Sequence, residues 1–267
     1  MSTPAQITWS PLARTLAADI SAAGARCVAI AGAQGSGKTT LARILVHELM
    51  SRGSRAIVCS LDDFYLSRGQ RLELSRAVHP LLQTRGVPGT HDVDLCLRTL
   101  DRVARAPTPM PRFDKGLDDR LDPSRWPIEG PADVVVIEGW CLGARAQPPA
   151  DLVEPVNDLE RHEDRDARFR TFVNDALRER YPALFERFDK LVFLQVPDFD
   201  AVKRWRTEQE LQIEPAHRMT AAQLTRFVAH YERLTRWMCA DVPSRADLTV
   251  LLDASHGIAT TRTKAGH

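Results

Sequence analysis

The segment GAQGSGKTT, residues 32–40, constrains the fold of this chain more than any other stretch. It has a glycine at position 32, four intervening residues, and then Gly37, Lys38 and Thr39. Glycines at these positions let the backbone curl so that successive N–H groups point inward, where they can bind phosphate oxygens. The spacing therefore predicts a phosphate-binding loop, which needs a strand before it and a helix after it.

The residues on either side of the loop have the required pattern. Residues 26–32 are a continuous apolar run that ends in glycine, and residues 40–50 carry apolar side chains over a wide helical face. Four further apolar runs predict strands, and they cover residues 55–61, 133–139, 190–196 and 248–253. Because these runs are apolar throughout rather than alternating, we expect five parallel strands with helices on both faces.

Two further regions indicate helices outside the loop. Ser10 and Pro11 are typical of an N-cap and a first helical residue, which predicts a helix from there to about residue 23. Apolar residues at helical spacing predict another helix over 171–189, with a break at Pro182. Strands that alternate with helices indicate a doubly wound α/β fold.

A long amphipathic helix is predicted over residues 220–238. It opens on a capping box formed by Thr220 and Gln223. Its apolar stripe, which includes Phe227 and Tyr231, is expected to belong to the core rather than to a ligand site.

We expect a single domain over residues 1–267, because no repeat, flexible linker or low-complexity tract marks a boundary. The predicted nucleotide-binding core comprises residues 26–63 and 133–253. The long Pro-rich piece 64–132 is an insertion between the second and third strands, and we assign acceptor binding to it. Residues 200–220 are predicted to form a lid.

Composition excludes several classes of function. A formal net charge of +1 gives no footprint for nucleic acid or an anionic membrane. The N-terminus lacks a signal-peptide pattern, and no apolar run approaches the roughly 18 residues that a membrane span needs. The 5 cysteines are odd in number and scattered, which favours a reducing cytoplasm. We therefore expect a cytoplasmic protein that acts on a small molecule, with its oligomeric state left open.

The phosphate loop predicts the nucleotide and metal ligands. Lys38 is placed to reach the β- and γ-phosphates, and the Thr39 hydroxyl is placed to bind Mg²⁺. Glu138 ends a predicted central strand at the edge where the metal must lie, although an acidic residue there can also simply cap the strand. The residues assigned to ATP are Gly32, Ala33, Gln34, Gly35, Ser36, Gly37, Lys38, Thr39 and Thr40.

The segment SLDDFYLS, residues 60–67, places Asp62 and Asp63 between apolar groups. Two such carboxylates are costly if both are charged and unpaired. An aspartate at the end of the second strand is well placed to orient an acceptor hydroxyl and to accept its proton. If the strand continued, the two side chains would point to opposite faces, and strand geometry alone could not choose between them.

The order of these motifs, with Gly32–Thr39 first, D-x-F-Y at 62–65 next and Glu138-Gly139 last, resembles the uridine kinase, phosphoribulokinase and pantothenate kinase group of P-loop kinases. The resemblance implies a P-loop NTPase fold. It also implies that Asp62 is the catalytic base and that Glu138 helps to bind Mg²⁺.

Several blocks resemble plant-type D-glycerate 3-kinases and their bacterial relatives more specifically. This resemblance implies ATP-dependent phosphorylation of D-glycerate to 3-phosphoglycerate. Phe113 stands where the plant pattern has tyrosine. The blocks are residues 81–95, 109–120, 122–127, 137–143, 155–160 and 204–210.

A small hydroxy acid needs a cation for its carboxylate and hydrogen-bond partners for its hydroxyls, and arginine suits a planar carboxylate best. Any one of the charged candidates could instead be a solvated loop residue, and a lone histidine is more often structural than catalytic. The predicted acceptor-binding residues are Asp63, Tyr65, Arg85, His91, Asp92, Arg112 and Lys115.

Two charged segments remain. Arg204 and Arg206 of the lid could neutralise the phosphates, but arginines two residues apart do not share a helical face, so at most one is expected to reach them. Residues 158–168 are expected to be solvated.

Two rival functions stay open. One is a kinase for another small metabolite, such as a nucleoside or a pantothenate-like compound. The other is a nucleotide-binding regulatory module without turnover, against which the joint presence of Lys38, Thr39, Asp62 and Glu138 argues.

Overall fold

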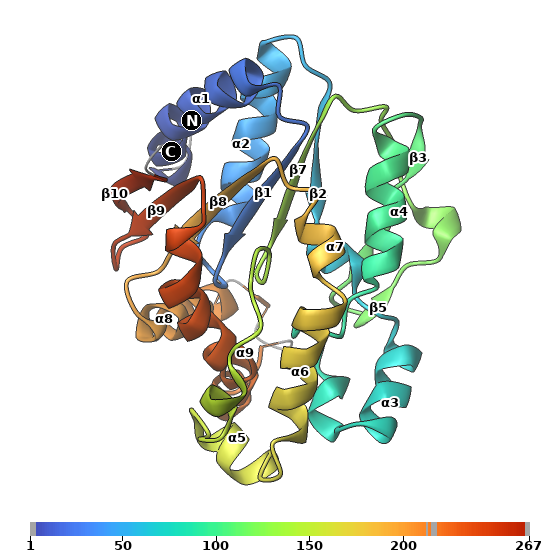
Figure 1. Ribbon diagram of the computed structural model, residues 1–267, viewed down its shortest axis with the longest axis vertical. Helices are drawn as coiled ribbons and strands as arrows, with labels where there is room; N and C mark the ends of the chain where they lie inside the picture. Colours follow the sequence, from blue (N-terminus) through green and yellow to red (C-terminus); the bar gives the residue numbers. More distant parts are fainter. Residues whose placement is uncertain (1–3, 212, 215–217, 265–267) are drawn as a thin grey trace.

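The five apolar runs form the parallel strands of a central sheet, as predicted (Figure 1). The structure, a computed structural model, describes residues 4–211, 213–214 and 218–264. The strand order is β10-β9-β8-β1-β7-β2, and every neighbouring pair from β9 to β2 is parallel. The parallel strands are β1 (Cys27–Gly32), β2 (Ala56–Ser60), β7 (Val134–Gly139), β8 (Lys190–Gln195) and β9 (Leu248–Leu252).

A sixth strand, which the sequence did not indicate, extends the sheet at one edge. β10 (Ile258–Thr263) pairs antiparallel with β9. Its residues are exposed except for the half-buried Ile258, so its sequence lacks the apolar run that identified the other strands.

Helices cover both faces of the sheet because alternate strand residues point to opposite sides. Val28 and Ile30 of β1 belong to the core beneath α1, α2 and α8, whereas Ala29 and Ala31 belong to the core beneath α4, α6 and α7. Helix α9 contributes to both cores. The helices are α1 (Pro4–Ala23), α2 (Lys38–Ser51), α3 (Arg68–Ala77), α4 (Val93–Val103), α5 (Asp158–Glu163), α6 (Arg168–Glu179), α7 (Pro182–Phe185), α8 (Phe199–Leu211) and α9 (Ala221–Asp241).

The expected helix start at Ser10 and Pro11 is wrong, because α1 begins at Pro4 and contains Pro11 in its interior. Trp9, in the turn before that proline, is buried against the phosphate loop beside Gly37. This packing holds the extra turns onto the protein although Pro11 lacks the N–H of a regular helical residue. The other helix signals are confirmed: the break at Pro182 separates α6 from α7, and the capping box opens α9.

The insertion 64–132 contains α3, α4 and two small two-stranded sheets. Figure 1 shows α3, α5 and α6 beyond the end of the sheet at which β1 terminates. The small sheets pair β3 (Thr108–Pro109) with β6 (Ile128–Glu129), and β4 (Phe113–Asp114) with β5 (Asp119–Arg120). Of the predicted lid 200–220, residue 212 and residues 215–217 lie outside the described residues.

Candidate active site

The phosphate loop joins the end of β1 to the start of α2. Gly35 and Gly37 have φ values of +80° and +89°, in the left-handed region that glycine adopts without strain. A Cβ atom on Gly35 would lie 2.8 Å from Cβ of Trp205, and one on Gly37 would lie 3.0 Å from the ring of Trp9. Two tryptophans from different helices therefore hold the glycine loop in its curled shape.

The Lys38 side chain folds back over this loop and donates a hydrogen bond to the Ala33 carbonyl oxygen at 2.9 Å. Burial lowers the pKa of the Lys38 ammonium, and the nearby carboxylates of Glu138 and Asp62 act in the opposite direction. A buried ammonium at the mouth of a loop of N–H groups attracts anions, which agrees with a phosphate site.

The other residues assigned to the nucleotide divide into two sets. Gln34 lines the cavity described below, and among the described residues neither its Oε1 atom nor the Oγ atom of Ser36 has a hydrogen-bond partner. Buried polar atoms are normally paired, so these two are available to a bound molecule. Gly32 packs against β8, where a Cβ atom would lie 2.8 Å from the Leu194 carbonyl oxygen, and Thr40 continues α2.

Glu138 lies at the end of β7 with only 6% of its surface exposed. Its Oε1 atom accepts hydrogen bonds from the Thr39 hydroxyl at 3.2 Å and the Ser60 hydroxyl at 2.8 Å. Within the described ranges no lysine or arginine forms an ion pair with it, which leaves a buried carboxylate without direct charge compensation. An all-oxygen donor set of this kind fits a divalent cation such as Mg²⁺. Ser60 carried no sequence signature and was not predicted.

Asp62 follows β2 in a short 3₁₀ helix, Leu61–Phe64, and not in an extended strand. Its Oδ1 atom accepts a hydrogen bond from the Tyr65 hydroxyl at 2.7 Å, and its Oδ2 atom accepts one from the Lys115 ammonium at 2.8 Å. Burial raises the pKa of Asp62, but Lys115 and the Tyr65 hydrogen bond outweigh it and lower the pKa to about 2. Asp62 is therefore ionised at neutral pH.

Asp63 has a different environment, because successive 3₁₀ side chains are rotated by about 120° rather than placed on opposite faces. It accepts a hydrogen bond from the Phe113 N–H at 3.0 Å and pairs with Arg112 at 3.3 Å. Arg112 also pairs with Glu129 at 2.7 Å. Asp63 and Arg112 thus fasten the insertion to the end of β2, and neither lines the cavity that contains Asp62.

A cavity of about 370 Å³ lies at this end of the sheet and brings together the phosphate loop, Asp62 and the insertion. Among the described residues, four cationic side chains from three separate parts of the chain line it: Lys38, Arg85, Lys115 and Arg206. Its other lining residues are Gln34, Gly35, Thr39, Asp62, Tyr65, Glu138, Trp140, Gln209, Ile213, Phe227 and Tyr231.

The aromatic wall of the cavity was not predicted. Phe227 and Tyr231 belong to the apolar stripe of α9, which does pack into the core as expected but also faces the cavity. Tyr231 donates a hydrogen bond to the Arg85 carbonyl oxygen at 2.8 Å, and its ring contacts Trp140 edge to face. A stripe at helical spacing does not reveal which of its members end beside a cavity.

His91 and Asp92, predicted to bind the acceptor, lie outside this cavity. The His91 ring is buried, its Nδ1 atom lies 2.6 Å from the Tyr181 hydroxyl, and it stacks on Tyr65 with ring centroids 4.8 Å apart. Burial lowers the pKa of His91 to about 4, so the ring is neutral and supports Tyr65 from behind. Asp92 caps α4 and pairs with Arg120.

Only one of the two lid arginines lines the cavity. Arg206 does so, and its guanidinium pairs with Glu210 at 2.7 Å and lies over the Phe227 ring. Arg204 is exposed on α8. The expectation that at most one arginine reaches the site agrees with this arrangement.

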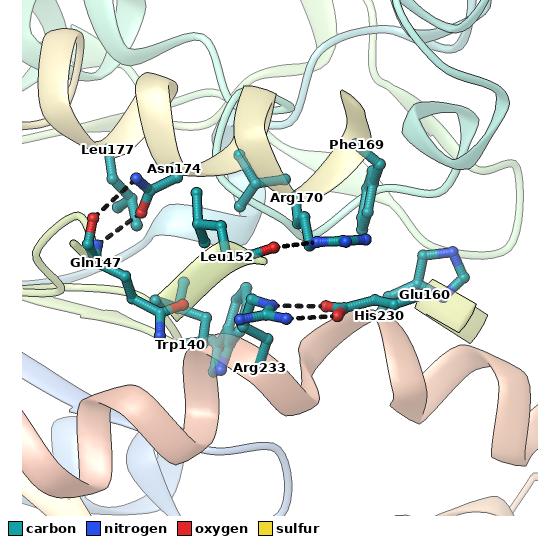
Figure 2. Close-up of a pocket in the computed structure, with 12 residues that line it drawn as sticks. Trp140, Gln147, Leu152, Glu160, Phe169, Arg170, Asn174, Leu177, His230 and Arg233 are labelled. Carbon is teal, nitrogen blue, oxygen red and sulfur yellow. Dashed lines mark hydrogen bonds and ion pairs between the residues drawn. The ribbon is translucent and has the colours of Figure 1, made fainter. Parts of the chain in front are cut away.

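A second, much smaller pocket lies between α6 and α9, with room for about one water molecule at roughly 20 Å³. Figure 2 shows Arg233 facing Glu160 across it, and their hydrogen bonds measure 2.8 Å and 2.7 Å. Asp164 is also fully buried and pairs with Arg170 at 2.9 Å. The expectation that residues 158–168 are solvated is therefore wrong for Glu160 and Asp164, because arginines from α6 and α9 cover them.

The Arg233–Glu160 pair makes a stability prediction. Arg233→Met leaves the buried Glu160 carboxylate without its partner, and we expect the free energy of unfolding to fall by about 3–5 kcal/mol. Urea-induced unfolding followed by circular dichroism measures this change. The matched control is Arg226→Met, which removes a half-exposed pair with Glu163 and should cost less than about 1 kcal/mol. Equal losses for both variants would contradict the assignment.

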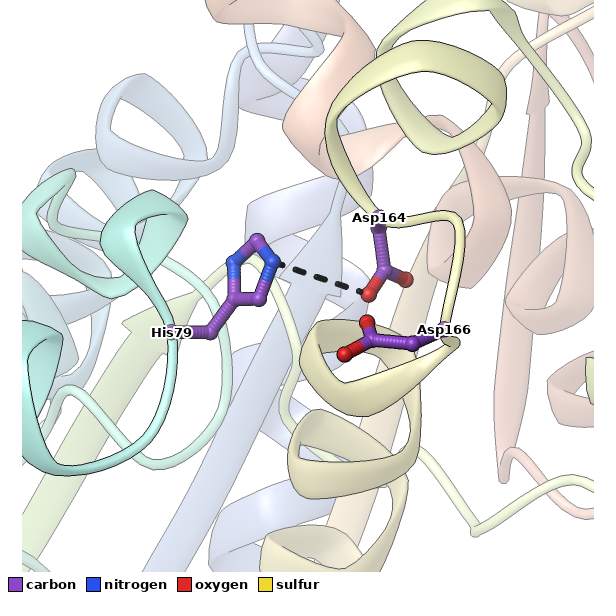
Figure 3. A group of neighbouring side chains, drawn as sticks. All are labelled: His79, Asp164 and Asp166. Carbon is purple, nitrogen blue, oxygen red and sulfur yellow. Dashed lines mark ion pairs between the residues drawn. The ribbon is translucent and has the colours of Figure 1, made fainter.

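His79, Asp164 and Asp166 approach one another closely enough to suggest a metal site (Figure 3). Nδ1 of His79 accepts a hydrogen bond from the Leu81 N–H at 3.2 Å, so in the neutral ring the proton lies on the Nε2 atom that faces Asp164. Asp164 is already bound by Arg170 and by two backbone N–H groups. The cluster is a contact between the insertion and the turn that precedes α6, and because both oxygens of Asp164 are already bound it does not fit a cation.

Comparison with known proteins places this site in a family. The chain is 33% identical over 215 residues to the uncharacterized kinase mug58 of Schizosaccharomyces pombe, and the match covers 76% of each chain. It is 33% identical over 214 residues to the chloroplastic D-glycerate 3-kinase of Arabidopsis thaliana, which covers 74% of this chain and 44% of that one. No protein-family model matches the chain.

The fold has solved counterparts as well. D-glycerate 3-kinase from Cryptococcus neoformans superposes with a TM-score of 0.78 at 24% identity, over 94% of this chain and 99% of that one. None of the described helices combines the length and the hydropathy that a membrane-spanning segment needs. The chain belongs to the P-loop kinases, with D-glycerate 3-kinase among its relatives, and it is a phosphotransferase that acts on an alcohol group of a small molecule.

Proposed function

We propose that the protein transfers the γ-phosphoryl group of ATP to a hydroxyl of D-glycerate, which yields 3-phosphoglycerate and ADP. The observation that carries this proposal is that four residues line the same cavity. They are Lys38 of the phosphate loop, Asp62, and the cations Arg85 and Lys115. A small acid needs a base for its hydroxyl and cations for its carboxylate, and this cavity offers both.

In the proposed reaction, the acceptor oxygen forms a bond to the γ-phosphorus while the bond from that phosphorus to the β–γ bridging oxygen breaks. The proton of the acceptor hydroxyl passes to Asp62, and ADP leaves with the bonding electron pair. Lys38 and Arg206 are placed to offset the negative charge of the phosphates, as phosphoryl transfer requires. We assign Arg206, rather than Arg204, to the lid's phosphate contact.

We assign Mg²⁺ to Thr39 and Glu138, since their oxygens meet at the edge of the cavity and Glu138 lacks a direct cationic partner among the described residues. The ion would supply positive charge to the phosphate oxygens. Ser60 donates to Glu138 at 2.8 Å and so holds that carboxylate in place.

A cytoplasmic location is also part of the proposal. All 5 cysteines are free, and three of them are buried in the core, which is compatible with a reducing compartment. We propose that the partner is the small-molecule acceptor, with no nucleic acid and no membrane involved.

A nucleoside kinase is the second candidate, because Trp140, Phe227 and Tyr231 could stack on a base. We expect D-glycerate to stimulate ADP release by the protein far above the rate with buffer, while uridine, cytidine and pantothenate do not. A coupled assay for ADP over this panel measures the difference. Stimulation by a nucleoside alone would replace the acceptor, and stimulation by none of them would favour a regulatory module without turnover.

A further inference from the structure

Each oxygen of the Asp62 carboxylate already accepts a hydrogen bond, and the bond to Oδ2 comes from a cation, which opposes the transfer of a proton to the proposed base. Tyr65 donates to Oδ1, and the Lys115 ammonium donates to Oδ2. We propose that Lys115 guards Asp62, in the sense that its ammonium blocks the Asp62 carboxylate while the site is empty. The carboxylate of an acidic acceptor then binds this ammonium and moves it away from Asp62. The acceptor's hydroxyl takes the place of the ammonium beside Asp62. This inference rests on the proposed function and gives a reason why the acceptor must be an anion.

Of the two partners of Asp62, Lys115 is the one that can leave. The Tyr65 ring is buried, stacks on His91, and meets Phe113 edge to face with centroids 5.1 Å apart. The Lys115 side chain is 63% exposed, and its flexible stem bears a compact charge that can be redirected. Tyr65 therefore fixes the orientation of the carboxylate, while Lys115 controls access to it.

The backbone around Lys115 does not depend on the contact with Asp62. Lys115 lies in the turn between β4 and β5, where Oδ1 of Asp114 accepts hydrogen bonds from the N–H groups of Gly116 at 2.8 Å and Leu117 at 3.0 Å. The Phe113 N–H is bound to Asp63. Because the turn is closed by Asp114 and anchored at Asp63, the ammonium can swing away without rebuilding the hairpin.

Arg85 supplies the second cation at the place to which Lys115 would move. It lines the same cavity, pairs with Asp118, and lies over the Phe113 ring with its guanidinium carbon 5.5 Å from the centroid. A carboxylate bound by Arg85 and Lys115 together would compete with Asp62 for the ammonium. An uncharged alcohol offers the ammonium only a neutral hydroxyl oxygen, a weaker partner than the Asp62 carboxylate, so the base stays blocked and the alcohol is a poor acceptor.

The decisive variant is Lys115→Met, which keeps the length of the side chain and removes its charge. If Lys115 guards the base, ATP hydrolysis without acceptor and phosphorylation of glycerol should both rise about tenfold, since water and an uncharged hydroxyl now reach Asp62. The KM for D-glycerate should rise about tenfold, because one charged hydrogen bond to its carboxylate is lost. A lysine that only binds the carboxylate would raise KM without either gain.

D-lactate gives a second measurement on the wild-type protein. It has the carboxylate and the 2-hydroxyl of D-glycerate but no 3-hydroxyl. We expect it to stimulate ATP hydrolysis in the wild type, because it draws Lys115 away and water takes the vacant position, and to have no such effect on Lys115→Met. The stimulation of the wild type by D-lactate can be measured whether or not the variant folds.

Two companion variants complete the test. Lys115→Arg keeps a cation beside Asp62 and should keep hydrolysis low, and Lys264→Met removes an exposed lysine outside the cavity and should change nothing. One outcome would overturn only the role of Lys115: the wild type phosphorylates D-glycerate, but neither D-lactate nor the Lys115→Met substitution increases ATP hydrolysis. The proposed function would then stand. A wild type that no acceptor stimulates overturns both.

Discussion

Asp62→Asn is expected to lower kcat for D-glycerate phosphorylation by about 10²–10⁴-fold, the contribution of a positioned general base. An amide oxygen still accepts the hydrogen bond from Tyr65, so the side chain should keep its place. The amide cannot accept the acceptor's proton, however, and it no longer attracts the Lys115 ammonium. The loss should therefore appear in kcat measured at saturating ATP and acceptor.

ATP binding should be nearly unchanged in this variant. The phosphate loop is shaped by its glycines and by the packing of Trp9 and Trp205, and Lys38 is held by the Ala33 carbonyl. Titration calorimetry with a non-hydrolysable ATP analogue should give a Kd close to that of the wild type. Near-normal turnover in Asp62→Asn would remove Asp62 from the mechanism.

Asp63→Asn is the matched control, because it makes the same chemical change one residue away. Asp63 accepts from the Phe113 N–H and pairs with Arg112, and it does not line the cavity. Asparagine can still accept the backbone hydrogen bond, so we expect a small loss of stability and a kcat near that of the wild type. Equal losses of kcat in both variants would mean that the segment is sensitive to any change of charge.

Local features of the sequence were sufficient to place the glycine loop, Asp62 and Glu138 at one edge of the sheet. The apolar runs of the five parallel strands and the glycine spacing of residues 32–39 are each contained in one short segment. Parallel strands end at the same edge of a sheet, so the loop after β1, Asp62 after β2 and Glu138 at the end of β7 were bound to meet there.

The features that sequence reasoning missed depend on distant partners. Residues 158–168 look solvated by composition, yet Glu160 is buried because Arg233 lies 73 residues further along the chain. Trp140 and Tyr231 look like core residues, and only the contact of α9 with Trp140, just after β7, makes them a cavity wall. A mixed charge run and an aromatic stripe have the same appearance in a sequence whether or not such a partner exists.

The acceptor half of the site shows the same limit. The cations of the insertion were recognised as a set, but the structure divides them: Arg85 and Lys115 face the cavity, whereas Arg112 is bound to Asp63 and Glu129. The contact between Lys115 and Asp62 spans 53 residues and is made by a hairpin whose strands have two residues each. No periodic pattern is long enough to indicate a hairpin of that size.

Lys38→Ala is expected to lower kcat by about 10²–10³-fold, because the variant lacks the ammonium that we assign to the transferring phosphoryl group. We expect the free energy of unfolding not to fall. Burial lowers the pKa of the Lys38 ammonium, which means that the charged form of Lys38 destabilises the folded protein. Lys38→Met separates charge from volume: it fills the loop but carries no charge. Steady-state kinetics and thermal melting of both variants test this expectation. A wild-type rate in Lys38→Met would mean that the Lys38 side chain acts by packing under the Ala33 carbonyl rather than by its charge. Arg206 and the N-terminus of helix α2 would then have to offset the charge of the phosphates.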